Sequence, residues 1–388
     1  MALRLCLNAT WRWQIDDVIQ DSTAFGPQRA PDPKQQLQHQ MHGFEKAAAS
    51  LRTTTSSLPP FSNLSESDLM SPAKGAVCVT GAGGFLGSWV AHLLLSRNYL
   101  VRGTVRDPLD EKYAHLKQLP NASSNLELVK ADLLDYPSLV SAIQGCSGVF
   151  HVASPVPSSS VSNPQVDLIE PAVTGTLNVL KACVETKVKR VVYVSSAAAV
   201  FMNPSWPDSQ PMDESCWSDA EYCRATENWY YLSKTEAEIK AMEYAKANGL
   251  DVVSVCPNLI IGPLLKPTVN ASTMVLTKLL KEGKDLEENK HHRVVDVRDV
   301  AEALVLVYEK PEAQGRYICT AHSIHVKDVV DILKEKYPNY NYPRNFTDGE
   351  EKKEMSSEKL QRQGWSYRSL QETLVDAVES YKKAGVLD

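Results

Sequence analysis

Val77-Cys78-Val79-Thr80-Gly81-Ala82-Gly83-Gly84-Phe85-Leu86-Gly87 is the stretch that decides the fold of this 388-residue chain. An apolar strand stands directly before a glycine-rich turn, and an amphipathic helix follows it. Glycine permits positive φ angles and close backbone approach, while the start of a helix offers free N–H groups. Because residue 86 is leucine, the spacing is T-G-x-x-G-x-x-G rather than a strict G-x-G-x-x-G. The context favours a pyrophosphate-binding turn, formed by residues 80–87, over a plain surface turn.

The same alternation of strand and helix continues beyond the turn. Short runs rich in Val and Ile alternate with segments of helical period from Lys74 onward, which is typical of a parallel sheet covered on both faces. Strands are predicted at 76–80, 100–105, 126–130, 148–152, 190–195 and 251–256, and helices at 87–98, 171–186 and 226–248. Residues 74–262 are therefore predicted to form a doubly wound α/β domain of the Rossmann type.

The two ends of the chain look different from this core. Residues 263–388 carry helical patterns at 271–282, 297–309, 326–336 and 370–384, joined by long connections. They predict a smaller, mostly helical lobe that contributes the substrate pocket, with some segments returning to the core. Residues 1–73 show no period and are predicted to be disordered. Their acidic residues argue against a transit peptide, and a translation start at Met70 is a hypothesis that N-terminal sequencing tests.

Composition excludes several classes of partner. A net charge of -6 and a pI near 5.9 argue against binding to nucleic acid or to an anionic membrane surface. No apolar stretch approaches the roughly 20 residues that span a bilayer. The eight cysteines are scattered without a CxxC pair, which favours reduced thiols and no metal site. We expect a cytoplasmic protein with a small-molecule substrate, and the oligomeric state cannot be read from the sequence.

The end of the second strand bears on the choice of cofactor. Arg106 stands where an acidic residue would hydrogen-bond the 2′-hydroxyl of the adenosine ribose in NAD. A guanidinium suits a 2′-phosphate instead, through charge-assisted contacts. This position favours NADP(H), the alternative being a surface ion pair between Arg106 and Asp107.

Catalytic candidates follow from the fifth strand and the helix after it. Ser195 and Ser196 end the strand at the carboxyl edge of the sheet, where ligands bind in this architecture. Tyr230 and Lys234 are four residues apart and share a helix face. An isolated phenol gives up its proton reluctantly, and a lysine cation beside it favours the phenolate, as an acid–base catalyst needs. Tyr231 lacks a lysine four residues later, so Tyr230 is preferred, whereas strand alternation alone does not choose between the serines.

Taken together, these motifs resemble those of a known family. They are Thr80-Gly81-x-x-Gly84-x-x-Gly87, Val105-Arg106-Asp107-Pro108, Ala131-Asp132-Leu133, His151-Val152-Ala153-Ser154-Pro155, Ser195-Ser196, Asp213-Glu214-Ser215-Cys216-Trp217-Ser218-Asp219 and Tyr230-x-x-x-Lys234. The chain from about Gly75 to its C-terminus resembles the plant cinnamoyl-CoA reductase and dihydroflavonol 4-reductase group of extended short-chain dehydrogenases/reductases.

The resemblance implies roles for individual residues. Ser196, Tyr230 and Lys234 would form the catalytic triad, with Lys234 also holding the nicotinamide ribose. Arg106 and Lys112 would meet the 2′-phosphate, and Asp132 and Leu133 the adenine. The remaining residues that would line the cofactor are Val152, Ala153, Ser154, Pro257, Asn258, Leu259, Ile260 and Ser272.

The substrate is defined less sharply. The stretch Lys266-Pro267-Thr268-Val269-Asn270-Ala271-Ser272 is similar to the CoA reductases, and Lys278 and Arg316 match residues thought to meet the CoA phosphate. Four positions depart from that group: its usual N-W-Y-C-Y-G-K reads N-W-Y-Y-L-S-K here, which changes the three residues 231–233, and Val275 replaces a histidine. Phe201 stands where dihydroflavonol reductases commonly carry an asparagine.

We therefore expect NADPH-dependent reduction of a phenylpropanoid or flavonoid carbonyl, with a hydroxycinnamoyl thioester as the leading substrate. A dihydroflavonol, an aromatic aldehyde or an aromatic ketone is the alternative. NAD-dependent sugar epimerase or dehydratase chemistry and a catalytically silent NADP(H)-binding regulator are further alternatives.

Overall fold

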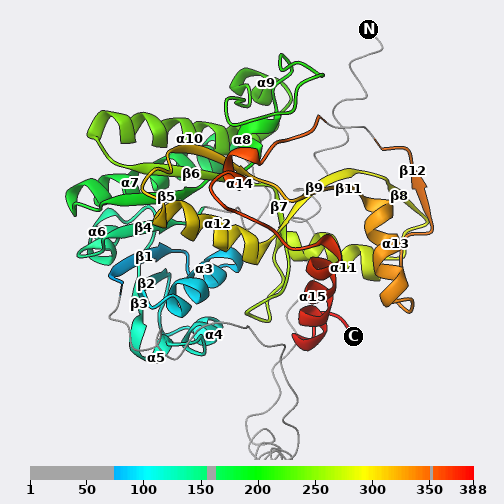
Figure 1. Ribbon diagram of the computed structural model, residues 1–388, viewed down its shortest axis with the longest axis horizontal. Helices are drawn as coiled ribbons and strands as arrows, with labels where there is room; N and C mark the ends of the chain where they lie inside the picture. Colours follow the sequence, from blue (N-terminus) through cyan, green and yellow to red (C-terminus); the bar gives the residue numbers. More distant parts are fainter. Residues whose placement is uncertain (1–73, 155–162, 350–352) are drawn as a thin grey trace, which may run out of the picture.

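The computed structural model of the chain describes residues 74–154, 163–349 and 353–388 (Figure 1). The disorder predicted for residues 1–73 and the proposed start at Met70 fall outside these ranges.

A seven-stranded parallel sheet forms the centre of the molecule, in the order β10-β6-β5-β4-β1-β2-β3. Its strands are β1 (Ala76–Thr80), β2 (Leu100–Val105), β3 (Leu126–Lys130), β4 (Gly148–His151), β5 (Arg190–Val194), β6 (Val252–Pro257) and β10 (Gly315–Cys319). The chain order reverses between β1 and β4, which is the switch point where ligands bind in open α/β sheets. The predicted Rossmann architecture is confirmed, and the first six strands lie within one residue of their predicted bounds.

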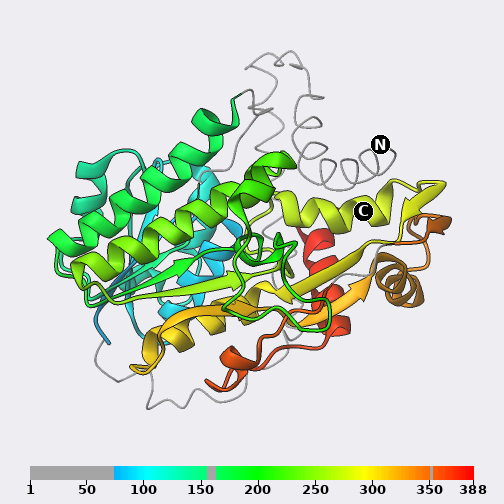
Figure 2. The same cartoon turned by 90° about the horizontal axis from the view of Figure 1, so that it is seen from above.

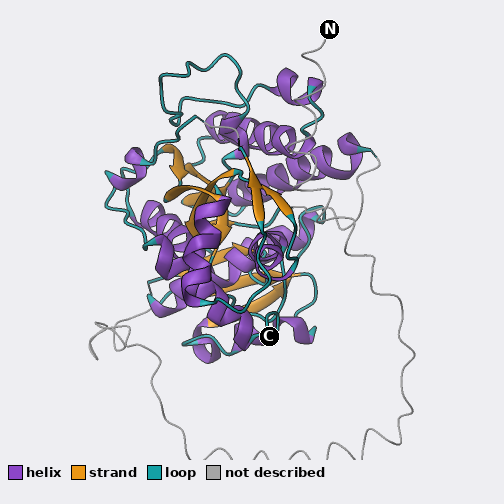
Figure 3. Cartoon of the chain, turned by 90° about the vertical axis from the view of Figure 1, so that its right-hand side faces the viewer, coloured by secondary structure: helices purple, strands orange, loops and turns teal. Residues whose placement is uncertain are grey.

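Helices cover both faces of this sheet (Figures 2 and 3). Helices α3 (Phe85–Ser96) and α12 (Val297–Glu309) pack together on one face. The other face is covered by α6 (Tyr136–Ile143), α7 (Glu170–Glu185) and α10 (Trp229–Asn248). Alternate strand residues feed the two cores: Val77 and Val79 pack toward α3 and α12, and Cys78 packs toward α6 and α7.

The C-terminal part forms a third core, on the right-hand side of Figure 1. It contains α11 (Ala271–Lys281), α13 (Val326–Lys336) and α15 (Leu370–Lys383) around the buried side chains of Leu280, Val330 and Tyr381. Two small sheets accompany the helices, with strand orders β11-β9-β7 and β12-β8. Their strands are β7 (Leu259–Ile261), β8 (Leu286–Glu288), β9 (His291–Asp296), β11 (His322–His325) and β12 (Asn345–Thr347).

The sequence predicted the helices of this part but not its strands. Two segments return to the central domain, since β10 adds to the large sheet beside β6 and α12 packs on α3. Whether the chain divides into two units near residue 262 stays a prediction.

Short helical segments complete the described chain. They are a 3₁₀ turn at Glu111–Tyr113, a π-helical segment at Gln165–Ile169, and α4 (Ala114–Lys117), α5 (Ala122–Asn125), α8 (Ala198–Phe201), α9 (Ala220–Ala225) and α14 (Glu358–Gln361). In the ranges that the structure describes, no helix is both long and apolar enough to cross a membrane.

Candidate active site

The glycine turn between β1 and α3 has the geometry of a phosphate cradle. Gly81 adopts a φ of +67°, and a Cβ on Gly87 would lie 2.2 Å from the Gly81 carbonyl oxygen. Both positions therefore require glycine. Gly84 begins α3 without a side chain capping the helix, which leaves first-turn N–H groups for an anion. The turn fits the pyrophosphate of a dinucleotide.

Thr80 and His151 link the two strands that flank the switch point. The Thr80 hydroxyl oxygen accepts the backbone N–H groups of Val152 at 3.1 Å and Ala153 at 3.0 Å. Its own proton is thus directed to His151 Nδ1, 2.9 Å away, which sets the proton of that ring on Nε2. Burial, helped by the charge of Lys234, lowers the pKa of His151 to about 3. A neutral histidine therefore fastens the residues after β4 to the end of β1.

Lys234 lies at the carboxyl edge of the sheet. Its ammonium donates to the hydroxyl oxygen of Ser154 at 2.8 Å and lies 5.8 Å from the centre of the Tyr230 ring. The side chain is 8% exposed. In the part of the chain that the structure describes, the Tyr230 hydroxyl makes no hydrogen bond, so it is available to a ligand. The structure thus brings Ser154, Tyr230 and Lys234 together.

The two serines after β5 face different surroundings. Ser195 is 4% exposed and donates to the Glu238 carboxylate at 2.7 Å, whereas Ser196 is half-buried and accepts the N–H of Ala198 at 3.1 Å. Ser195 is thus committed to a buried carboxylate, whereas the Ser196 hydroxyl is not. Burial raises the pKa of Tyr231, which makes it a poorer proton donor than an accessible phenol. The first difference favours Ser196, which the resemblance implied, and the second favours Tyr230, which the spacing to Lys234 favoured.

A closed polar cluster lies behind these residues. Glu238, whose side chain is fully buried, accepts from Ser195, from Ser254 at 2.6 Å and from Arg316 at 2.9 and 3.1 Å. Arg316 also donates to the carbonyl oxygens of Ala199, Glu214 and Cys216 and lies 3.4 Å from the centre of the Trp217 ring. The cluster joins α10 to β5, β6 and β10, and so fixes the helix that carries Tyr230 and Lys234.

The contacts of Arg316 argue against the phosphate-binding role expected for it. A guanidinium has five N–H donors, and five acceptors surround this one while its side chain is only 6% exposed. A substrate phosphate would have to displace the Glu238 carboxylate to reach it. Lys278, the other expected phosphate ligand, lies on α11 beside Glu282 at 4.0 Å and does not contact Arg316.

The residues expected around the adenosine lie beyond the ends of β2 and β3. Arg106 is exposed and forms no ion pair within the described ranges, so the alternative pairing with Asp107 is absent there. Lys112 contacts Asp110 at 2.5 Å and lies 5.0 Å from the centre of the Tyr113 ring. The carboxylate of Asp132 accepts the backbone N–H of Leu134 at 2.9 Å, next to the half-buried Leu133.

The residues expected near the nicotinamide follow β6. Pro257 ends this strand, Asn258 donates to the sulfur of Met355 at 3.2 Å, and Leu259 and Ile260 begin β7. Ser272 is half-buried in the first turn of α11, where its N–H donates to the side-chain oxygen of Asn270 at 2.9 Å.

Phe201 ends α8 and packs against two apolar clusters beneath the site. The guanidinium carbon of Arg293, from β9, lies 5.2 Å from the centre of its ring. A cation thus lies near the ring at the position where dihydroflavonol reductases commonly carry an asparagine.

Sequence reasoning missed Lys266, Glu238 and Arg293. A signal was present for Glu238, since Tyr230, Lys234 and Glu238 recur every four residues along one helix face. Arg293 lies in a strand that the sequence did not predict. The described cysteines are free and buried, and no group of histidine, cysteine and acidic side chains able to hold a metal occurs in the described ranges.

The parallel sheet, the glycine cradle after β1 and the pairing of Tyr230 with Lys234 at the carboxyl edge are those of an oxidoreductase of the short-chain dehydrogenase/reductase class. Residues 77–319 match the model of the NAD dependent epimerase/dehydratase family. The chain belongs to this family, and within it to the cinnamoyl-CoA reductase and dihydroflavonol 4-reductase group.

Three relatives illustrate this membership. The chain is 45% identical over 315 residues to cinnamoyl-CoA reductase 1 of Petunia hybrida, covering 80% of this chain and 93% of the relative. It is 42% identical over 322 residues to a bifunctional dihydroflavonol 4-reductase/flavanone 4-reductase of Malus domestica, covering 80% and 92%. The yeast methylglyoxal/isovaleraldehyde reductase Gre2, solved with NADPH, superposes with a TM-score of 0.70 at 27% identity, covering 80% and 99%.

Proposed function

We propose that the protein is a cytoplasmic NADPH-dependent reductase that converts a hydroxycinnamoyl-CoA thioester to its aldehyde. The observation that carries the proposal is the arrangement at the carboxyl edge of the sheet: Tyr230 has an available hydroxyl, and Lys234 is held beside it by Ser154. Similarity to cinnamoyl-CoA reductases supports the thioester as substrate.

NADPH fits the residues present. The turn of Gly81, Gly84 and Gly87 would hold the pyrophosphate, and Arg106, which forms no ion pair with any described residue, would meet the 2′-phosphate. Lys234 would donate to the nicotinamide ribose. When bound, NADPH supplies a hydride to the substrate carbonyl carbon.

The protein's own part in the reaction is to hold the carbonyl and supply a proton. Ser196 and Tyr230 would donate hydrogen bonds to the carbonyl oxygen, stabilising the negative charge that develops there. Tyr230 would transfer its proton to that oxygen, and the ammonium of Lys234 would stabilise the resulting phenolate. For a thioester, this gives a hemithioacetal. Its hydroxyl then loses the proton again as the carbonyl double bond re-forms and the carbon–sulfur bond breaks, and the departing sulfur takes up that proton, so the products are the aldehyde and CoA thiol.

A substrate screen with the full chain tests this function. At fixed NADPH, the rates with feruloyl-CoA, p-coumaroyl-CoA, dihydroflavonols and aromatic aldehydes are compared. The proposal expects the highest kcat/KM with a CoA thioester, whereas a higher value for a dihydroflavonol or an aldehyde would assign the enzyme to that substrate. Turnover of a nucleotide sugar with NAD would support the epimerase or dehydratase alternative.

Tyr230→Phe removes the proposed proton donor while keeping the ring, so kcat should fall by a factor on the order of 100 to 10,000. Tyr231→Phe is the matched control, because it removes the neighbouring hydroxyl from the same helix and should leave most activity. NADPH should still bind the Tyr230→Phe variant. Absence of turnover in the wild-type protein with every substrate, despite NADPH binding, would favour a silent regulator.

A further inference from the structure

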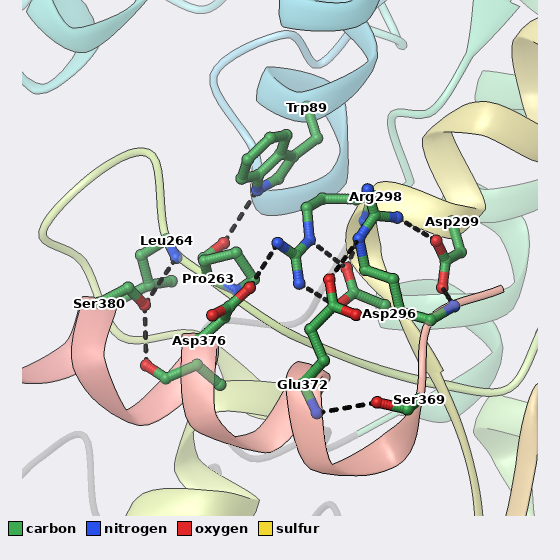
Figure 4. Close-up of polar contacts among 12 residues, drawn as sticks. Trp89, Pro263, Leu264, Asp296, Arg298, Asp299, Ser369, Glu372, Asp376 and Ser380 are labelled. Carbon is green, nitrogen blue, oxygen red and sulfur yellow. Dashed lines mark hydrogen bonds and ion pairs between the residues drawn. The ribbon is translucent and has the colours of Figure 1, made fainter. Parts of the chain in front are cut away.

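The loop between β7 and α11 is anchored on both sides just before Lys266 (Figure 4). Trp89 of α3 donates from its indole N–H to the Pro263 carbonyl oxygen at 2.9 Å. The N–H of Leu264 donates to the hydroxyl of Ser380 on α15 at 3.0 Å. These two bonds hold the loop between the cofactor-binding helix and the C-terminal helix.

Helix α15 is itself fastened to the central domain. Arg298 of α12 donates to Asp376 of α15 at 2.6 Å and to Asp296 at 2.7 Å, as Figure 4 shows. Asp299 accepts the backbone N–H of Arg368, just before α15, at 2.8 Å. The position of Lys266 is therefore set by two surfaces of the fold and not by its loop alone.

From this loop Lys266 reaches the phosphate-binding turn. Its ammonium donates to the carbonyl oxygen of Gly83 at 2.9 Å. Tyr113 packs on the other side of Gly83, where an added Cβ would come within 2.2 Å of the tyrosine ring. The ammonium of a residue 183 positions away in sequence thus lies at the cradle formed by residues 81–87.

The charge of Lys266 is not neutralised by the described residues. The side chain is half-buried, no carboxylate lies within ion-pair distance, and Gly83 is its one described hydrogen-bond partner. Burial and the nearby charge of Lys112 lower the pKa of Lys266. Two of its three N–H donors remain for a ligand, and the surroundings favour an anion.

We propose that Lys266 binds a phosphate group of the dinucleotide, clamping the cofactor from the C-terminal side of the molecule. The proposal rests on the NADP(H) part of the proposed function and not on the identity of the substrate. The phosphate is either the pyrophosphate or the 2′-phosphate, which share the same recognition chemistry.

Titration of NADPH and NADH into the full chain tests the clamp without any substrate. Lys266→Met removes both the charge and the bond to Gly83, whereas Lys266→Gln keeps a donor for Gly83 and removes only the charge. Both variants should raise the Kd for NADPH about tenfold, because a hydrogen-bonded charge pair is lost. Lys240→Met is the control: it changes the net charge equally at a surface ion pair with Glu243 on α10. Its Kd should equal that of the wild type.

The two cofactors identify which phosphate is bound. An equal loss with NADPH and NADH indicates the pyrophosphate, and a loss with NADPH alone indicates the 2′-phosphate. Unchanged affinity in both Lys266 variants overturns the proposal, as does a loss in Lys266→Met that Lys266→Gln restores. A raised KM for a CoA thioester with unchanged NADPH affinity would assign Lys266 to the substrate and also overturn it. If the wild type binds neither dinucleotide, the cofactor part of the proposed function fails instead.

Discussion

Two cationic side chains in this molecule have opposite surroundings. Arg316 is 6% exposed, and five acceptors, among them the buried Glu238 carboxylate, satisfy its guanidinium. Lys266 is half-buried beside the glycine turn, with one carbonyl oxygen as its described partner and a like charge, Lys112, nearby. Arg316 matches a residue of the resembled family, and Lys266 begins the stretch 266–272 that is similar to the CoA reductases. Only Lys266 keeps N–H donors that no described residue accepts.

Cations whose N–H donors are all satisfied by the protein stabilise the fold, whereas cations with unsatisfied donors can bind a ligand. A buried cation with a complete set of acceptors has no capacity for a phosphate, and removing its partner leaves an uncompensated charge. A half-buried cation without a counter-ion is stabilised when it binds an anion. We accordingly propose that Arg316 positions the α10 helix and that Arg106 and Lys266 bind the cofactor.

The largest effect on stability is expected at the closed cluster. Arg316→Met leaves Glu238 buried and unpaired, which should lower the free energy of unfolding by about 3–5 kcal/mol. The double variant Arg316→Met with Glu238→Gln removes both charges and should recover part of that loss. Urea unfolding measures both. The assignment would be wrong if Arg316→Met kept full stability and raised only the KM for a CoA thioester.

The free energy of unfolding is expected to depend on pH through His151, which is hydrogen-bonded to Thr80. An exposed histidine titrates near pH 6.5, whereas burial lowers the pKa of His151 to about 3. Between these values the unfolded chain binds a proton that the folded chain does not, so stability rises with pH up to about 6.5. At pH 5 the contribution lost is roughly 2 kcal/mol.

His151→Asn should flatten this dependence, since its amide oxygen can accept the Thr80 hydroxyl proton and does not titrate. The measurement is the difference in unfolding free energy between pH 7 and pH 5 for the two proteins. Equal differences would show that His151 is protonated in the folded state, contrary to its burial.

Local patterns in the sequence were sufficient for the first six strands of the central sheet but not for β10. Buried parallel strands are apolar runs in the sequence, so β1 and β2 were predicted at their observed bounds. Helices α12 and α13 were predicted at their observed bounds from their helical period. The strands of the C-terminal part are short or carry charged and histidine residues, as in His291–Asp296. They form because distant segments pair, for example β7 with β9, and no local pattern reports such pairing.

Of the candidate site, the sequence predicted only what local spacing determines. Tyr230 and Lys234 lie on one helix, so their spacing alone brings them together. The acceptors around Arg316 come from residues 199, 214, 216 and 238, and only the folded chain makes them converge. Lys266 reaches Gly83 across 183 positions, which sequence spacing could not reveal.

The central claim is that Arg106 and Lys266, which form no ion pair within the described residues, bind the phosphates of NADP(H). Isothermal titration of NADPH and NADH into the wild-type protein and Arg106→Gln tests it most directly. The wild type should bind NADPH at least about tenfold more tightly than NADH, since one charge-assisted contact to the 2′-phosphate is worth that factor. Arg106→Gln should lose this preference with NADH affinity and melting temperature unchanged. Equal binding of the two cofactors by the wild type, or an undiminished preference in the variant, would contradict the account.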